Sequence, residues 1–158
     1  MKKVLFVCLG NICRSPAAQG IMEALIVQNN LQDKIYADSA GTIGYHTGES
    51  PDPRMLLQAS DRGFELNHKA RKFNPIIDFD EFDYILTMDD QNYFDIKSLD
   101  KNNQYSSKIY KITAFSSDKN VKTVPDPYYG GAQAFDNVID LLKDACINLL
   151  NKIKDDFK

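Results

Sequence analysis

A continuous apolar run near the start of the chain, Val4 to Val7, leads directly into a turn and then into a helical pattern. Such a run is typical of a strand buried on both faces of a parallel sheet. Ser15 and Pro16 suit the N-cap and first turn of the helix that follows. Its apolar residues recur at helical spacing: Ala18, Ile21, Met22, Leu25 and Ile26. With a second strand expected near residues 34–38, this segment has the size of a βαβ unit.

Strands and helices continue to alternate along the rest of the chain. Asp52-Pro53 begins a second helix that Gly63 ends. Residues 83–88 read as a third strand and residues 108–112 as a shorter fourth strand. Between these two strands, Asp89 or Asp90 is a candidate cap for a short helix that reaches Phe94.

A long helical pattern runs from Gly131 to the end, with one apolar face: Phe135, Val138, Ile139, Leu142, Cys146, Leu149, Leu150 and Ile153. Strands that alternate with helices predict an α/β fold in three layers, with a four-stranded parallel twisted sheet and helices on both faces. We expect residues 1–158 to form a single domain, because the chain has the length of one core and shows no linker or repeat. Ligands of such sheets bind at the carboxyl ends of the strands, so the turn after the first strand is the first candidate site.

That turn reads Cys8-Leu9-Gly10-Asn11-Ile12-Cys13-Arg14-Ser15-Pro16. Successive backbone N–H groups and a helix N-terminus can bind an anion there, and the planar fork of Arg14 can hold two oxygens of a phosphate. The same field favours the thiolate of Cys8, which is then a nucleophile. Gly10 is expected in a conformation that a side chain would disfavour, and Asn11 tolerates left-handed geometry. The sequence therefore predicts a phosphate-binding loop that carries a reactive cysteine.

This loop closely resembles the signature of the low-molecular-weight protein tyrosine phosphatase family. The resemblance continues through residues 38–42 (DSAGT), 84–89 and 126–130 (DPYYG), in the order and at the separations that the family shows. It covers nearly the whole chain. It implies hydrolysis of phosphotyrosine and small aryl phosphates through a phosphocysteine on Cys8, with the phosphate held by Arg14.

Asp126 lies between Pro125 and Pro127, which stiffen the backbone and hold its carboxyl group in one direction. From the residues alone this is a stiff turn. The resemblance implies that Asp126 is the general acid and base, a role typically worth ~10²–10⁴-fold in rate. Tyr128 and Tyr129 follow it and are candidates to line the cleft against a substrate ring.

Further roles rest on the resemblance alone. Ser15 is expected to hydrogen-bond to the Cys8 sulfur, Ser39 to Asn11, and Asp89 to lie near Arg14 or the loop. His68 is expected in a buried polar network behind the loop, although an ordinary surface histidine is almost as good an interpretation. Tyr45 is expected to form the opposite wall of the cleft, with Leu9 and Ile12 on its floor. Many relatives carry a tryptophan near that position, and this chain has none.

Three cysteines, an odd number, indicate reduced thiols rather than a disulfide framework. In the family, Cys8 and Cys13 can form a reversible disulfide that protects the nucleophile; Cys13 as a small packed residue is an equal alternative. Cys146 is expected in the core. Between Arg14 and Cys146 there is no cysteine, which disfavours a thiol-dependent arsenate reductase, the nearest rival enzyme. A phosphotyrosine-binding protein without turnover is a further alternative.

A net charge of -3 and scattered Lys and Arg argue against a nucleic-acid surface. No apolar run approaches the ~20 residues of a membrane span, so a cytoplasmic protein is expected. With no CxxC pair and two histidines, no metal site or cofactor is expected. The expected partners are phosphotyrosine-containing proteins, and phosphate or other oxyanions are expected as inhibitors.

Overall fold

The computed structural model describes all 158 residues and contains one four-stranded parallel sheet. Its strands are β1 (Lys2–Cys8), β2 (Ile35–Gly41), β3 (Tyr84–Thr87) and β4 (Ile109–Lys111). They lie in the order β2-β1-β3-β4, so the apolar N-terminal run occupies an inner position. Val4 pairs with Ala37 of β2 on one side and with Tyr84 of β3 on the other.

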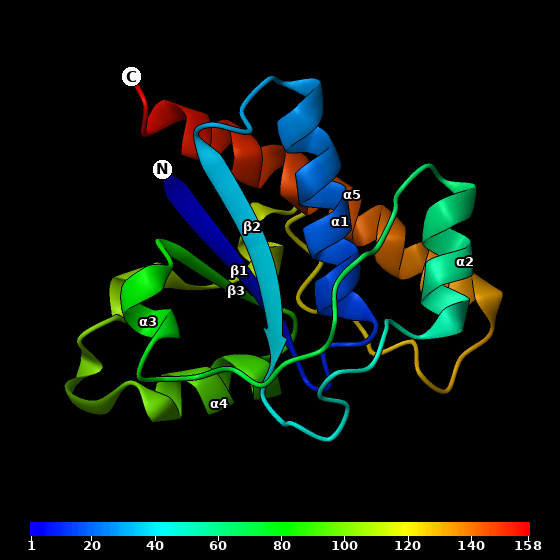
Figure 1. The fold of residues 1–158 in the computed structure, drawn as a ribbon, viewed down its shortest axis with the longest axis horizontal. Coiled ribbons are helices and arrows are strands. Elements are labelled where there is room, and N and C mark those ends of the chain that lie inside the picture. Colours follow the sequence, from blue (N-terminus) through cyan, green and yellow to red (C-terminus); the bar gives the residue numbers. More distant parts are fainter.

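Helices cover both faces of this sheet, as predicted (Figure 1). On one face, α1 (Arg14–Gln28) and α5 (Ala132–Asp155) pack together over Val4 and Phe6, and α2 (Pro53–Asp61) packs against α5. On the other face, α3 (Asp78–Glu81) and α4 (Asp90–Leu99) enclose a smaller core with Leu5 and Val7. Successive β1 side chains therefore point into different cores, which explains why the run is apolar throughout.

The position of β1 determines where a ligand can bind. The chain passes from β1 through α1 to β2 on one side, and then crosses to β3 on the other side of β1. The loops that follow β1 and β3 therefore diverge from a point where the strand order reverses. A crevice at such a point is the usual ligand site of an open α/β sheet.

Several boundaries differ from the sequence predictions. The second strand extends through Gly41 rather than ending at Asp38, because it pairs with β1 along its whole length to Cys8. Asp89, not Asp90, caps α4, and this helix continues to Leu99 rather than ending at Phe94. The short helix α3 was not predicted, since four residues are too few for a periodic pattern. Three short 3₁₀ helices, at Lys101–Asn103, Ser106–Lys108 and Ile112–Phe115, contribute no residue to the site.

Gly63 ends α2 as predicted. Its φ of +86° lies in the left-handed region, where glycine has no steric penalty. The amide of Phe64 donates to the Ala59 carbonyl and the amide of Gly63 donates to the Ser60 carbonyl. These two hydrogen bonds form a Schellman motif, which satisfies carbonyl groups that the helix end would leave free.

The predicted N-cap of α1 was wrong. The helix begins at Arg14, one residue before Ser15, and Cys13 occupies the cap position without a side-chain hydrogen bond. The Ser15 hydroxyl lies next to the Cys8 sulfur instead. The Ser-Pro pair correctly predicted the start of a helix, but the Ser15 hydroxyl contacts the Cys8 side chain instead of capping the helix.

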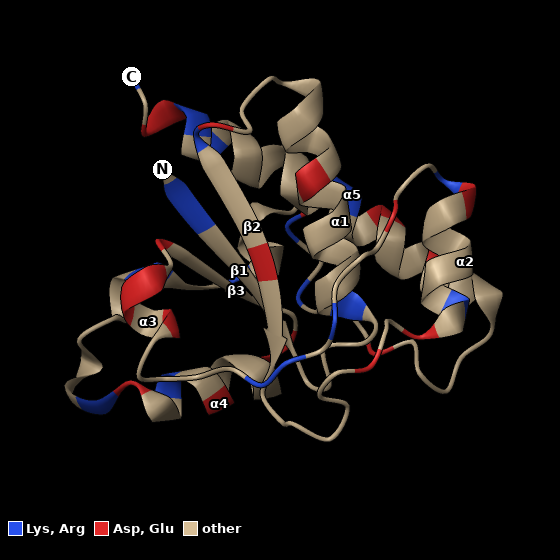
Figure 2. Cartoon of the chain, in the orientation of Figure 1, with Lys and Arg blue, Asp and Glu red and all other residues tan.

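Acidic and basic residues are spread over helices, strands and loops rather than gathered in one region (Figure 2). No helix combines the length and the apolar character that crossing a bilayer would require.

Candidate active site

The turn after β1 has carbonyl groups that are bound within the protein and amide groups that are not. The carbonyls of Cys8, Leu9 and Ile12 accept hydrogen bonds from the backbone of residues 42, 43 and 52. The amides of residues 9–13 donate to no acceptor of the protein. Those of Arg14 and Ser15 belong to the first turn of α1, where N–H groups lack helical partners. A curved row of free N–H groups at a helix N-terminus is an anion-binding site.

Asn11 holds this turn in shape. Its φ of +60° is left-handed, as predicted, and its side chain is 1% exposed. The Oδ1 atom accepts from the Arg71 amide at 3.0 Å and from His68 Nε2 at 2.7 Å. The Nδ2 atom donates to Ser15 Oγ at 2.7 Å and to Ser39 Oγ at 2.9 Å. All four hydrogen-bonding positions of the amide are therefore used, which favours one loop conformation.

Ser15 connects this network to the cysteine. Its Oγ lies 3.0 Å from Cys8 Sγ and already accepts a hydrogen bond from Asn11. Its proton is thus available to the sulfur, since the other acceptor, the Ala40 carbonyl, is 3.5 Å away. A hydroxyl that donates to sulfur stabilises the thiolate relative to an unbonded one.

Arg14 is 3% exposed and is oriented by one edge of its guanidinium. Its Nη1 atom donates to Asp89 Oδ2 at 2.7 Å and to the Val124 carbonyl at 3.0 Å. Asp89 is itself held at the start of α4, because its Oδ1 accepts from the Asn92 amide. The Nε and Nη2 atoms make no hydrogen bond within the protein, which leaves a two-pronged edge for oxygens of an anion.

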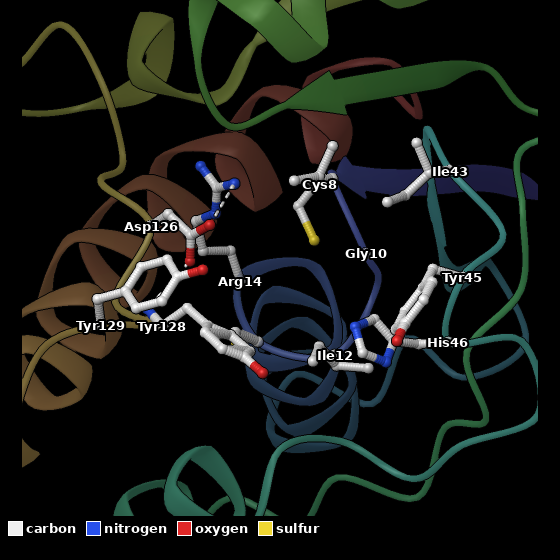
Figure 3. Close-up of a pocket in the computed structure, with 12 residues that line it drawn as sticks. Cys8, Gly10, Ile12, Arg14, Ile43, Tyr45, His46, Asp126, Tyr128 and Tyr129 are labelled. Atoms are coloured by element: carbon white, nitrogen blue, oxygen red, sulfur yellow. Dashed lines mark hydrogen bonds and ion pairs between the residues drawn. The ribbon is translucent and has the colours of Figure 1, made fainter.

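Asp126 lies beside that edge, although it is more than a hundred residues away in the sequence. Its Oδ2 is 3.8 Å from Arg14 Nη2, and its Oδ1 accepts from the Tyr128 amide at 3.1 Å. Its side chain is 45% exposed. Figure 3 shows the carboxyl group of Asp126 and the sulfur of Cys8 on the same cleft. A proton donor and a nucleophile are thus available around one anion position.

The cleft has a volume of about 270 Å³. Ile43, Tyr45 and His46 lie on one side of Cys8, and Asp126, Tyr128 and Tyr129 lie on the opposite side (Figure 3). Leu9, Gly10, Ile12 and Cys13 also line it, so every residue predicted for the cleft contacts it except Asn11 and Ser15, which lie behind the loop. Most of the lining is apolar or aromatic, which suits a flat hydrophobic group attached to the anion.

Two cleft residues were missed by the sequence reading. Ile43 and His46 belong to the loop after β2, and no motif marked them. His46 pairs with Glu49 and stacks edge-on against Tyr45, with ring centroids 4.8 Å apart. Such contacts depend on how the loops after β1 and β2 meet, so no local signal could have identified them.

A side chain is disfavoured at Gly10, as expected, but the reason is a close neighbour rather than the backbone conformation. Gly10 has no positive φ; instead, a Cβ atom there would lie 3.0 Å from the His46 ring. Gly41 has a stricter requirement, because a Cβ there would lie 2.7 Å from the Leu9 carbonyl oxygen. A backbone carbonyl cannot shift to make room for a Cβ atom as readily as the end of a flexible side chain can. Glycine at position 41 therefore permits β2 to approach the loop.

Behind the loop, Ser39 donates to Gln19 Oε1 at 2.6 Å, and His68 Nδ1 lies 3.5 Å from Asp38. The His68 side chain is 11% exposed, so it belongs to the buried network and is not an ordinary surface histidine. Burial lowers the pKa of His68 more strongly than the nearby carboxylate of Asp38 raises it. The neutral ring, with its proton on Nε2, can then donate to Asn11.

The remaining thiols lie in different surroundings. Cys13 lines the cleft, and burial raises the pKa of its thiol well above the ordinary value, with a further contribution from the Asp52 carboxylate. Cys146 is fully buried between α5 and α1, where burial also raises the pKa of the thiol. No disulfide is present.

Comparison with known proteins agrees with this geometry. The model of the family "Low molecular weight phosphotyrosine protein phosphatase" matches residues 3–158. A Synechocystis sp. protein provisionally assigned as a low molecular weight protein-tyrosine-phosphatase is 52% identical over 151 residues, which are 96% of each chain.

Solved structures show the same similarity. A protein tyrosine phosphatase from Entamoeba histolytica has a TM-score of 0.94 and 43% identity, with both chains covered completely. A Drosophila arginine phosphatase has a TM-score of 0.89 and 32% identity over 98% of each chain. The match of the family model over almost the whole chain, and the close relatives beside it, show that the chain belongs to the low molecular weight phosphotyrosine protein phosphatase family.

Proposed function

We propose that this phosphatase hydrolyses phosphotyrosine through a phosphocysteine on Cys8. The observation that carries the proposal is the placement of Cys8 at the loop of free amides, beside the edge of Arg14 that makes no hydrogen bond, and within the same cleft as Asp126. One anion position is thereby surrounded by a nucleophile, by charge-stabilising donors and by a carboxyl group that can move a proton.

In the first step, the Cys8 thiolate forms a bond to phosphorus while the bond from phosphorus to the phenolic oxygen breaks. Arg14 and the loop amides hold the three other phosphate oxygens, and Asp126 donates its proton to the leaving oxygen. In the second step, Asp126 takes a proton from water, which attacks phosphorus and releases phosphate and the thiolate. Ser15 supports departure of the sulfur through its hydrogen bond. Because Arg14 and the amides supply the positive charge, the scheme uses no metal.

The walls of the cleft support an aryl substrate. Tyr45 and Tyr128 face each other across the position of Cys8, and Ile12 and Ile43 complete an apolar lining (Figure 3). A tyrosine ring gains from burial between such groups, whereas a charged guanidinium loses hydration there. Phosphoarginine, the substrate class in the name of the Drosophila relative, is therefore the second candidate rather than the first.

A comparison of kcat/KM on phosphotyrosine, phosphoserine and phosphoarginine peptides of one sequence tests this assignment. We expect phosphotyrosine to exceed each of the others by at least ~10-fold, since burial of an aromatic side chain contributes roughly 1.5–3 kcal/mol. Inorganic phosphate should inhibit competitively, because it fits the same loop. An equal or higher rate on the phosphoarginine peptide would reverse the assignment.

We also propose that Cys13 protects the nucleophile during oxidation. Peroxide converts the Cys8 thiolate to a sulfenic acid; the sulfur of Cys13 then forms a disulfide with Cys8 and releases water. Both cysteines line the same cleft, which supports this pairing. Burial raises the pKa of Cys13, so little of it is ionised at neutral pH and the disulfide should form more completely as pH rises.

Mass spectrometry after peroxide treatment at several pH values measures this protection. We expect the ratio of disulfide to Cys8 sulfinic acid to increase between about pH 6 and 8.5, because the thiolate fraction below a thiol pKa grows roughly tenfold per pH unit. Dithiothreitol should restore activity in proportion to the disulfide, and Cys13→Ser should not recover. Equal recovery of that variant would exclude the role for Cys13.

The rival activities lack support in the geometry. Cys146, the third thiol, is fully buried away from the cleft, so no relay of thiols is available for arsenate reduction. A binding protein without turnover would not need an acid beside the arginine. Three free thiols suit a reducing compartment, so the proposal places the protein in the cytoplasm with phosphotyrosine proteins as its partners.

A further inference from the structure

Apart from its junction with α5, the segment that carries Asp126 is held to the rest of the protein by hydrogen bonds at two points. On its N-terminal side, the Val124 amide donates to the Met88 carbonyl, and the Val124 carbonyl accepts from Arg14. Between Pro125 and Gly131, the only hydrogen bond to another part of the chain is the one that Tyr128 accepts. Without the second attachment, every hydrogen bond that holds this segment to another part of the protein would lie on the N-terminal side of Asp126.

Arg54, in the first turn of α2, supplies the second attachment. Its Nη1 atom donates to the Tyr128 carbonyl at 2.7 Å. The guanidinium carbon lies 5.2 Å from the centre of the Tyr128 ring and 4.7 Å from the centre of the Phe135 ring. Contacts of this type between a cation and an aromatic face add to the hydrogen bond. Arg54 therefore holds both the backbone and the side chain of Tyr128.

The other edge of Arg54 is held by Asp52. Its Nε and Nη2 atoms donate to the two carboxylate oxygens at 3.0 and 2.8 Å, in the bidentate arrangement that only arginine can form. Asp52 is 8% exposed, and its hydrogen bonds with Arg54 lower the pKa of its carboxyl group, so it stays ionised at neutral pH. Its amide donates to the Ile12 carbonyl of the phosphate-binding loop at 2.8 Å.

These contacts form one connection across the site. It runs from Ile12 to Asp52, from Asp52 to Arg54, from Arg54 to Tyr128, and from the Tyr128 amide back to the carboxyl group of Asp126. Each end of the connection belongs to one half of the proposed chemistry: the phosphate-binding loop at one end and the acid at the other. Arg54 itself does not line the cleft.

We infer that Arg54 is a positioning residue that sets the direction of the Asp126 carboxyl group relative to the phosphate-binding loop. The inference rests on the proposed function, because it requires that Asp126 donate a proton to the leaving oxygen. Arg54 binds Tyr128, and Tyr128 in turn holds the Asp126 carboxyl group, so Arg54 needs no contact with the substrate. Removal of the Arg54 side chain should therefore lower kcat/KM only for substrates whose leaving oxygen needs a proton from Asp126.

The dependence on the leaving group provides the test. Phenyl phosphate expels a basic phenolate and needs the acid, whereas dinitrophenyl phosphate expels a far weaker base and does not. For Arg54→Ala we expect kcat/KM on phenyl phosphate to fall roughly 10- to 100-fold, a part of the ~10²–10⁴-fold contribution of a general acid. On dinitrophenyl phosphate we expect a fall of less than about threefold, because nucleophile and arginine are untouched.

Three further variants make the result specific. Arg54→Lys should recover only part of the loss, because an ammonium group cannot bind Asp52 through two N–H groups and also reach Tyr128. In an Asp126→Asn background, Arg54→Ala should change the phenyl phosphate rate less than about twofold, since coupled residues are not additive. Arg62→Ala is the matched control: Arg62 ends the same helix and pairs with Asp136 and Asp140 of α5, away from the cleft. It should leave both rates unchanged.

Equal losses on the two substrates, full recovery by lysine, or an additive loss in the Asp126→Asn background would each overturn the inference. If Asp126→Asn itself left the phenyl phosphate rate intact, the proposed role of Asp126 would fail instead, so the two failures can be told apart. Circular dichroism and thermal unfolding of each variant confirm that the fold is retained. Arg54 is about half exposed, so its replacement leaves no buried cavity.

Discussion

Replacing Cys8 by serine abolishes turnover: we expect kcat on phosphotyrosine and on p-nitrophenyl phosphate to fall at least ~10³-fold, the scale seen when a nucleophile is removed. A serine hydroxyl is a weak nucleophile unless a base accepts its proton. The side chain next to Cys8 is Ser15, whose own proton points to position 8, and the nearby His68 is already used by Asn11. Serine at this position would therefore have no base.

Phosphate affinity separates loss of chemistry from loss of structure. Because the amides and Arg14 remain, Cys8→Ser should still bind inorganic phosphate, measured by calorimetry, within about tenfold of the native protein. Cys146→Ala is the control thiol variant; it removes a sulfur that is remote from the cleft and should keep kcat while it lowers stability. Activity in EDTA should be unchanged. A Cys8→Ser protein with more than a trace of activity, or activity that chelation removes, would contradict the scheme.

Replacing Asp126 by asparagine should lower kcat/KM on phosphotyrosine by ~10²–10⁴-fold, the usual contribution of general acid catalysis. Asparagine can still accept the hydrogen bond from the Tyr128 amide, so the turn should keep its shape. What it lacks is a transferable proton. The loss should shrink as the leaving group becomes more acidic, because a weaker base departs without a proton.

Asp118→Asn is the matched control for this change. Asp118 belongs to the same long loop and accepts a hydrogen bond from the amide two residues ahead, as Asp126 does. It lies outside the cleft, so its replacement should leave kcat/KM within about twofold, as for surface changes away from a site. If both variants lost activity equally, the effect would belong to the loop and not to proton transfer.

The sequence predicted the fold class because its signals are local. The apolar run of β1 identifies a strand buried on both faces, and the spacing along α5 identifies one apolar face of a helix. The phosphate-binding loop was recognisable for the same reason: Cys8, Arg14 and the intervening turn lie within one strand-to-helix connection, where spacing almost determines geometry.

Site residues from distant segments could not be assigned from sequence spacing alone. Asp126 could be named as the acid only through the family resemblance, since a proline-flanked aspartate is otherwise a stiff turn. Ile43 and His46 had no signal at all, because they reach the cleft only where the loop after β2 meets the loop after β1. From the residues alone Ser15 was assigned to the helix cap, and its contact with the Cys8 sulfur, which the structure shows, was expected only from the family resemblance.

Sequence by itself therefore determined the layers, the strand that carries the nucleophile and the anion-binding loop, because each depends on residues within a few turns of one another. Tertiary structure decided which edge of Arg14 is free, how Asn11 is satisfied, and how Arg54 links the loop to the acid. These features depend on the order of strands and on the packing of α2 against α5. Hydrogen bonds between residues that are dozens of positions apart act over a few ångströms in space, and only the packed chain sets those distances.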